Sequence, residues 1–258
     1  MPFSADWLAL REPADSRARD EKLMSLAVSA AGAKPVIMDL GCGTGSTIRA
    51  LKQQLPSNTE WRLVDNDPAL LEIAAKEAPD RVTIYQLDLA DVDQLPVSGV
   101  TMITASALLD LVSKDWLEDF LKRVSVPVYF ALTYNGSMNW IPNDDQDPIV
   151  TKAFNAHQQT DKGLGLALGP NASEVAIELL EDLGYKVLVA DSPWKLDSEN
   201  TLLQEELLRG ISEAAGNSGA DSTAIWLANK LSNLKILKSG IGHRDILAFP
   251  SGFQVGGH

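Results

Sequence analysis

The chain has 258 residues, enough to bury a full hydrophobic core, and its 22 basic against 35 acidic residues give a formal net charge of −13. This charge argues against nucleic acid or an anionic membrane as partner, because such binding depends mainly on Lys and Arg neutralising phosphates. A hydrophobic content of 45% and a charged content of 22% are ordinary for a soluble globular protein. We expect one domain over residues 1–258, with insertions.

Cysteine and histidine are scarce. The single cysteine, Cys42, has no partner for an internal disulfide, which fits a reducing cytoplasm. The three histidines are dispersed, so no metal site is expected. No apolar run approaches the ~20 residues that span a bilayer. The N-terminus also lacks a basic segment followed by an apolar one, so we expect a cytoplasmic protein.

Residues 4–31 favour two short cap helices. Ser4 or Asp6 is a suitable N-cap for the first, and Pro13 fits the first turn of the second. The second helix has an apolar face made of Leu23, Leu26, Ala27 and Ala30.

The most informative stretch is residues 36–46. A short apolar run at 36–38 favours a buried parallel strand and stops at Asp39. Gly41, Gly43 and Gly45 follow at alternate positions, and they suit a turn where the backbone approaches a ligand closely. Residues 44–55 then have helical spacing. The N–H groups at such a helix start favour a polar or negatively charged ligand group.

The run Asp39-Leu-Gly-Cys-Gly-Thr-Gly45 resembles motif I of the class I S-adenosylmethionine-dependent methyltransferases. The rival interpretation is the dinucleotide fingerprint G-x-G-x-x-G, whose third glycine is replaced here by Ser46. The resemblance covers about residues 36–190. It implies an α/β fold, a Rossmann-like three-layer sandwich whose seven-stranded sheet is mostly parallel, with an antiparallel last strand and helical insertions.

Two further strands end in acidic residues. Residues 60–65 form the second strand, and Asp65 at its end lies about the distance from the glycine turn that is expected of an acid binding a ribose. Asp67, followed by Pro68, favours a cap for the helix at 69–76, although the capping role also suits Asp65. The third strand is 82–86. The resemblance implies that Asp88 accepts a hydrogen bond from the adenine amino group and that Leu89 donates its N–H to the ring.

The fourth strand, 100–105, leads to Ser106 at the mouth of the expected site. The Asp/Asn-Pro-Pro-aromatic tetrapeptide of the methyltransferases that act on base amines is absent here, which argues against nucleic-acid substrates. Asp110 is a candidate for steering the substrate, with a helix-capping or surface role as the alternative. The resemblance implies that Arg11 or Arg17 pairs with the methionine carboxylate. The full cofactor set is Asp39, Gly41, Cys42, Gly43, Asp65, Asn66, Asp88, Leu89, Ala105, Ser106, Arg11 and Arg17.

After a fifth strand at 126–133 the chain departs from a minimal sheet. Within the insertion 134–170 we expect a turn at 134–136, a polar loop at 142–148 and a helix at 149–159. A glycine-rich segment follows at 160–170. A helix capped by Ser173 precedes the sixth strand, 185–190. Helices near 199–215 and 220–237 form the insertion 195–240 before a last strand at 243–249. We expect the cap helices and both insertions to meet at one rim and enclose a small-molecule pocket, with a homodimer interface on the helical pair as the alternative.

Methyl transfer from a sulfonium is an in-line displacement with a neutral leaving group, so alignment and exclusion of water are the main tasks. A base is needed only for a poorly ionised hydroxyl or a protonated amine. His157 is the candidate base, and a plain surface histidine is the alternative. Tyr134, Asp110 and Lys162 are candidate substrate contacts. We expect a methyltransferase acting on an oxygen or nitrogen of a small molecule. The alternatives are a non-catalytic cofactor-binding protein and an NAD(P)-dependent oxidoreductase.

Overall fold

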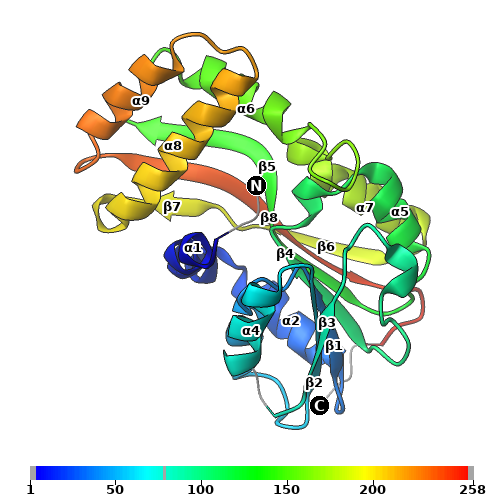
Figure 1. Cartoon of the computed structure of the whole chain (residues 1–258). Coiled ribbons are helices and arrows are strands. Elements are labelled where there is room, and N and C mark those ends of the chain that lie inside the picture. Colours follow the sequence, from blue (N-terminus) through cyan, green and yellow to red (C-terminus); the bar gives the residue numbers. More distant parts are fainter. Residues whose placement is uncertain (1–3, 78–79, 255–258) are drawn as a thin grey trace.

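The computed structural model describes residues 4–77 and 80–254. An eight-stranded sheet runs through it in the order β3-β2-β1-β4-β5-β8-β6, and β7 pairs with β8 beside this path (Figure 1). The strands are β1 (Val36–Leu40), β2 (Glu60–Asp65), β3 (Val82–Gln86), β4 (Met102–Ser106), β5 (Val128–Ile141), β6 (Lys186–Asp191), β7 (Trp194–Leu196) and β8 (Lys238–Phe249). Neighbours among β1–β5 are parallel, and β8 is antiparallel to its partners. The predicted mostly parallel sheet with an antiparallel last strand is confirmed, and β7 is an additional short strand.

Helices cover both faces of this sheet, as a three-layer sandwich requires. The helices are α1 (Ala5–Ala18), α2 (Glu21–Ala31), α3 (Ser46–Leu51), α4 (Pro68–Glu77), α5 (Lys114–Leu121), α6 (Asp147–Gln158), α7 (Ala172–Asp182), α8 (Thr201–Asn217) and α9 (Thr223–Ser232). On one face α5 and α7 pack through Trp116 and Leu180. On the other face α2, α3 and α4 pack through Leu23, Ile48 and Leu71.

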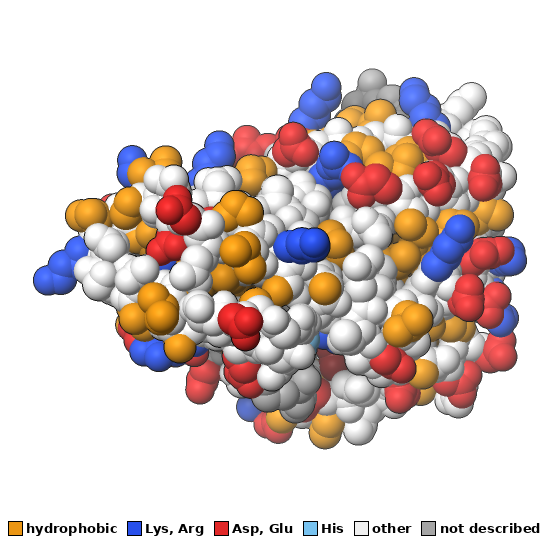
Figure 2. All heavy atoms as spheres, turned by 90° about the horizontal axis from the view of Figure 1, so that it is seen from above, with side chains coloured by type: hydrophobic (Ala, Val, Ile, Leu, Met, Phe, Trp, Pro, Cys, Tyr) orange, Lys and Arg blue, Asp and Glu red, His pale blue; other side chains and the backbone are white. Residues whose placement is uncertain are grey.

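A helical lobe extends from one side of the sandwich (Figure 1). The second half of β5 and the first half of β8, with β7 paired on the other side of β8, extend the sheet, and α6, α8 and α9 gather on this extension. Their shared core includes Trp140 from β5, Leu208 from α8 and Trp226 from α9. The face seen from above carries acidic and basic side chains interspersed over its surface (Figure 2).

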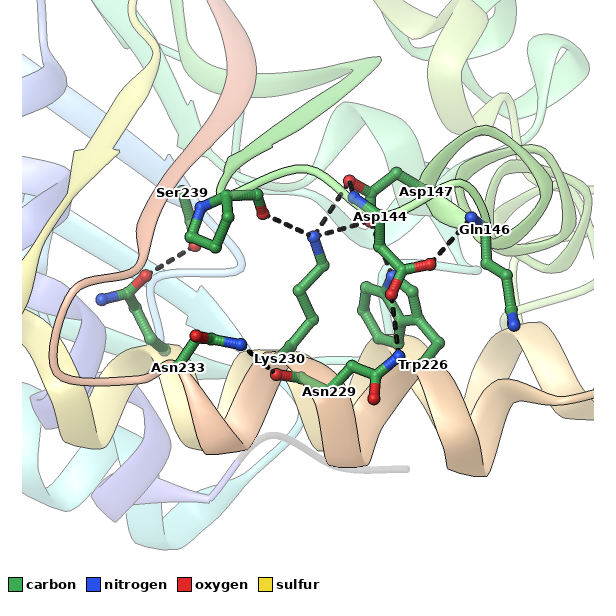
Figure 3. A network of polar contacts seen from close by, with 10 residues as sticks. Asp144, Gln146, Asp147, Trp226, Asn229, Lys230, Asn233 and Ser239 are labelled. Atoms are coloured by element: carbon green, nitrogen blue, oxygen red, sulfur yellow. Dashed lines mark hydrogen bonds and ion pairs between the residues drawn. The ribbon is translucent and has the colours of Figure 1, made fainter.

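A buried ion pair fastens α9 to the start of α6 within this lobe (Figure 3). Lys230, only 2% exposed, places its Nζ 2.8 Å from Asp147 Oδ1 and donates to the carbonyl of Pro142. The indole Nε1 of Trp226 donates to the same Asp147 oxygen over 2.7 Å. Asp147 is therefore bound by two side chains one turn apart on α9: Lys230 balances its charge and Trp226 donates a hydrogen bond.

Three local expectations were wrong. Pro13 lies inside α1, and the first helix ends only at Ala18, after which Asp20 caps α2 by accepting from the N–H of Leu23. The turn expected at 134–136 is part of β5, because pairing with β8 continues past it with a register shift. Ser173 lies within α7 and is not its N-cap residue, which is Asn171. Among the described residues, none of the helices is long and apolar enough to cross a membrane.

Candidate active site

A pocket of about 500 Å³ lies where β1, β2 and β4 end. This is the edge of an open α/β sheet at which ligands bind. Residues from α1, the glycine turn, three strand ends and the segment 162–164 line it. The lining is Leu8, Arg11, Asp15, Gly41, Cys42, Gly43, Thr44, Ser46, Thr47, Asp65, Asn66, Asp67, Leu70, Asp88, Leu89, Ser106, Ala107, Leu108, Leu111, Leu132, Lys162, Gly163 and Leu164.

The glycine turn forms the floor of the pocket. Gly41 and Gly43 adopt φ values of 58° and 51°, a left-handed conformation that other residues rarely take. A Cβ on Gly43 would stand 3.1 Å from the side chain of Leu8 in α1. The missing side chains therefore let α1 close over a backbone that remains open to a ligand.

Asp65 links this turn to the end of β2. Its Oδ2 accepts the N–H of Gly43 over 2.9 Å, and its Oδ1 accepts the N–H of Asp67 over 3.0 Å. A carboxylate has about four acceptor positions, so two remain for ligand hydroxyls on the pocket side. Asp67 accepts from the N–H of Ala69, as the cap of α4 that its sequence position predicts.

The end of β3 supplies the opposite wall. Asp88 is exposed, lines the pocket and accepts the N–H of Ala90 over 2.9 Å. Leu89 is buried beside it, and its carbonyl accepts the indole N–H of Trp116 over 2.6 Å. This bond fixes the backbone of Leu89 from behind. Ala105 does not line the pocket because it is a buried residue of β4.

Asp39 lies beneath the floor, fully buried. Thr104 Oγ1 donates to its Oδ1 over 2.7 Å, while Oδ2 has no hydrogen-bond partner. Burial raises the pKa of Asp39 to about 7, although Thr104 and the positive charge of Arg19 oppose the rise. The carboxyl group of Asp39 therefore keeps one free acceptor position. A positively charged ligand group nearby would lower its pKa.

Arg19 is a buried cation that sequence reasoning missed as a site residue. It is 4% exposed and donates from Nη2 to Ser106 Oγ over 2.9 Å, and the same hydroxyl lies 3.1 Å from Thr47 Oγ1. Arg17, which the resemblance implied for the cofactor, is exposed and does not line the pocket. The difference arises at the end of α1, where the chain turns Arg19 inward and leaves Arg17 facing solvent.

Arg11 does line the pocket. Its guanidinium donates to both oxygens of Asp15, over 2.9 and 3.2 Å, and stacks 4.9 Å above the Trp194 ring. The indole N–H of Trp194 donates to the same Asp15 carboxylate. Arg11 is thus held in a fixed orientation by α1 and β7 together.

His157 and Lys162 lie at the rim. His157 is partly buried on α6, outside the pocket lining, with Nδ1 3.3 Å from Lys162 Nζ. Burial, followed by the charge of Lys162, lowers the pKa of His157. Lys162 lines the pocket, and burial lowers the pKa of its ammonium group as well.

Tyr134 and Asp110 lie next to the pocket without lining it. The Tyr134 hydroxyl donates to Asn155 Oδ1 over 2.7 Å, which ties β5 to α6. Burial raises the pKa of Asp110 to about 6, and its Oδ1 has no hydrogen-bond partner.

Two strained residues complete the wall. Ala107, directly after β4, and Leu132, inside β5 where its register with β8 shifts, have φ values of 51° and 56°, and both line the pocket. The buried carboxylate of Asp245 holds the second one by accepting the N–H of Leu132 over 2.8 Å and the hydroxyl of Tyr129. Such strain occurs at functional sites that the surrounding structure fixes in place. No sequence pattern marks Asp245, because its partners lie on another strand.

The helical pair α8 and α9 contributes no residue to the pocket lining. The cap helix α1 and the segment 162–164 do reach it, so two of the three expected additions contact the pocket. Within the described ranges, no three His, Cys, Asp or Glu side chains are grouped to hold a metal ion.

Comparison with known proteins finds a family model that matches part of the chain and curated relatives of low identity. The family described as "Methyltransferase domain" matches residues 37–126. A carboxy-S-adenosyl-L-methionine synthase of Helicobacter pylori strain G27 is 26% identical over 180 residues, which cover 63% of this chain and 72% of that protein.

Solved structures share the fold at low identity. The YcgJ protein of Bacillus subtilis superimposes with a TM-score of 0.55 at 12% identity, over 90% of this chain and 100% of that one. A geranyl diphosphate methyltransferase in complex with S-adenosylmethionine gives a TM-score of 0.50 at 14% identity, over 97% and 92% of the two chains.

Proposed function

We propose that this chain is a class I S-adenosylmethionine-dependent methyltransferase and that it transfers a methyl group from S-adenosylmethionine to an oxygen or nitrogen of a small molecule. One observation carries the proposal. The glycine turn, Asp65 and Asp88, which follow three successive strands, line a single pocket of about 500 Å³. A cofactor with a ribose, a base and a charged amino-acid end needs polar groups spaced in this way.

The residues present fit that cofactor. Asp65 keeps two acceptor positions for the ribose hydroxyls, and Asp88 with Leu89 provides the polar edge for the adenine. Asp39, in β1 just before the glycine turn, has an unpartnered carboxyl oxygen, which suits the ammonium group of the cofactor. Arg11 carries the positive charge that suits the methionine carboxylate, whereas Arg17 lies too far toward solvent for this role.

In this proposal the residues of the pocket align the cofactor with the methyl acceptor and exclude water from the pocket. When bound, the cofactor supplies an electrophilic methyl group on a sulfonium. Leu8 from α1 and Leu164 from the insertion are apolar and line the pocket from different segments, so they shield the transfer from water. The strained backbone at Ala107 and Leu132 forms part of the pocket wall. No acid is required for a thioether leaving group. The role of His157 as base stays a prediction.

A second candidate function comes from the relatives named carboxy-S-adenosyl-L-methionine synthase. The observation that favours it is a further cation in the pocket. Lys162 lines the pocket, and within the described residues its Nζ bonds to a backbone carbonyl, to Thr160 and to His157, with no carboxylate among these partners. An additional carboxylate on the ligand would find a partner there.

The decisive experiment combines binding and turnover. Calorimetry with S-adenosylmethionine, S-adenosylhomocysteine and NAD should show micromolar binding of the first two and none of NAD. The purified protein, supplied with methyl-labelled S-adenosylmethionine and a deproteinised metabolite extract, should then label a small molecule. Mass spectrometry of the ligand copurified with the protein separates the two candidates by the mass of a carboxyl group. Binding of NAD alone would refute the proposal, and binding without any labelled product would favour a non-catalytic role.

The same proposal covers location and partners. We place the protein in the cytoplasm, which the free, buried thiol of Cys42 supports. The acceptor is a small molecule, and the net charge of −13 argues against nucleic acid and anionic membranes. A homodimer through α8 and α9 remains the alternative use of the helical lobe.

A further inference from the structure

The buried side chain of Arg19 lies behind the wall of the pocket. Arg19 directly follows α1, where its N–H donates to the carbonyl of Asp15 over 3.1 Å, and the next residue, Asp20, donates its N–H to Asp245 Oδ2 over 3.0 Å. The backbone is therefore held on both sides of Arg19, and its side chain, only 4% exposed, is directed into the protein. There its Nη2 donates to Ser106 Oγ, at the end of β4, over 2.9 Å.

This buried cation has no ion-pair partner. Within the part of the chain that the structure describes, none of the ion pairs includes Arg19. The buried carboxylate of Asp245 accepts instead from the N–H groups or the hydroxyl of Asp20, Leu132 and Tyr129. A buried charge is costly unless an opposite charge accompanies it, so we expect Arg19 to act on an anionic ligand group.

Two hydroxyl groups connect Arg19 with the pocket. Ser106 and Thr47 both line the pocket, and their hydroxyl oxygens lie 3.1 Å apart. A guanidinium can only donate, so Ser106 Oγ accepts from Arg19 and keeps its own hydrogen to donate. The bond between the two hydroxyls takes one of their two hydrogens, which leaves the other for a group inside the pocket. The pair thus offers the pocket a donor that is bonded to a positive charge.

The other cations of the pocket are engaged differently. Arg11 lines the pocket too, but its guanidinium donates to both oxygens of Asp15, which balance its charge. Lys162 belongs to the insertion and bonds within it. At the wall formed by the end of β4 and the start of α3, the positive charge therefore comes from Arg19. An anionic ligand group at this wall would accept a hydrogen bond that this charge strengthens.

We propose that Arg19 is a positioning residue, which orients and polarises the hydroxyl of Ser106 so that it donates to a carboxylate of the ligand bound in the pocket. In the proposed function, on which this inference rests, that group is the carboxylate at the amino-acid end of S-adenosylmethionine. Arg19 does not touch the ligand and acts on it through Ser106. Because Asp15 balances the charge of Arg11, Arg19 supplies the positive charge that Arg11 alone lacks for this group.

Two ligands that differ only in this carboxylate test the proposal. Calorimetry on the full chain compares S-adenosylhomocysteine with its decarboxylated analogue, which keeps the ammonium group. The proteins are the wild type, Arg19→Met, Ser106→Ala, the double variant and the matched control Arg17→Met, whose side chain is exposed on α1.

The expected result is a loss that depends on the carboxylate. Because a hydrogen bond to a charged group is lost, Arg19→Met and Ser106→Ala should each weaken binding of S-adenosylhomocysteine about tenfold or more, and binding of the analogue less than about twofold. The double variant should lose much less than the product of the two single losses, because Arg19 acts through Ser106. The control should change neither affinity.

Equal losses for both ligands, or no loss for either, overturn the role of Arg19, because a residue that only shapes the wall does not distinguish a carboxylate. Single losses that multiply in the double variant overturn the route through Ser106. If S-adenosylhomocysteine does not bind the wild type at all, the proposed function itself fails. Should Arg19→Met not fold, Arg19→Gln decides, since its neutral amide removes the charge and keeps a polar group. It must lower the preference for S-adenosylhomocysteine over the analogue about fivefold or more, and an unchanged preference overturns the proposal.

Discussion

Asp65 holds the glycine turn, and in the proposed function it also binds the ribose of the cofactor. Its oxygens hold the N–H groups of Gly43 and Asp67, and its remaining acceptor positions face the pocket. Because a lost charged acceptor leaves ligand hydroxyls without a partner, Asp65→Ala should weaken S-adenosylmethionine binding by about 1–3 kcal/mol. Calorimetry measures this, with Asp91→Ala as an exposed control. A folded Asp65→Ala variant with unchanged affinity would restrict Asp65 to holding the turn.

Asp39 should make stability depend on pH. Its folded pKa of about 7 exceeds the ordinary value of 3.8, so between these limits the folded chain keeps a proton that the unfolded chain releases. The contribution of Asp39 to the free energy of unfolding therefore falls as pH rises from about 4 to about 7 and is constant above that. Relative to wild type, Asp39→Asn should gain about 2 kcal/mol between pH 5 and pH 8 in urea unfolding. The same difference at both pH values would contradict the buried, protonated carboxyl.

At the scale of elements, the helical lobe depends on how α9 is attached to α6. Lys230 is 2% exposed and compensates Asp147, whose side chain is 14% exposed, while Trp226 donates to the same carboxylate (Figure 3). Removing one partner of a buried pair leaves an uncompensated charge, so Lys230→Met should lower the free energy of unfolding by about 3 kcal/mol. Urea unfolding gives this value.

The double variant Lys230→Met/Asp147→Asn is its control. It removes the stranded charge and keeps an acceptor for Trp226, so it should recover most of the loss. If the double variant is as unstable as Lys230→Met, packing of the Lys230 stem, which also lies 5.1 Å from the Trp140 ring, is the larger contribution.

At the scale of the whole molecule, the pocket is shared by the N-terminal helix α1, by the strand ends and by an insertion. Leu8, Arg11 and Asp15 of α1 and residues 162–164 line it together with the strand ends. Saturating S-adenosylmethionine, at about 100 times its Kd, should stabilise the fold by about 2.7 kcal/mol. Hydrogen exchange should slow in α1, the glycine turn and 160–168, and hardly at all in α8 and α9. Uniform protection of α8 and α9 would show that the lobe closes with the ligand.

The sequence alone determined most of the sheet. Apolar runs, a glycine turn and acids at strand ends are local features, so they predicted the parallel strands and the positions of Asp65 and Asp88 in one pocket. The antiparallel last strand and the class of cofactor were implied by the resemblance to the methyltransferases. The short β7 and the continuation of β5 through 134–136 were not predictable in this way. Both exist because they pair with β8, which is distant in the chain.

Only the tertiary structure decided which charged side chains face inward. Arg11, Arg17 and Arg19 follow one another on the same segment, and the end of α1 alone sends Arg17 outward and Arg19 under the pocket. Asp245 holds Leu132 across 113 residues of chain, and the β5–β8 register sets Tyr134 opposite His243. Burial, charge pairing and unpartnered atoms result from such contacts between distant segments. They cannot be predicted from the local pattern of residues in the sequence.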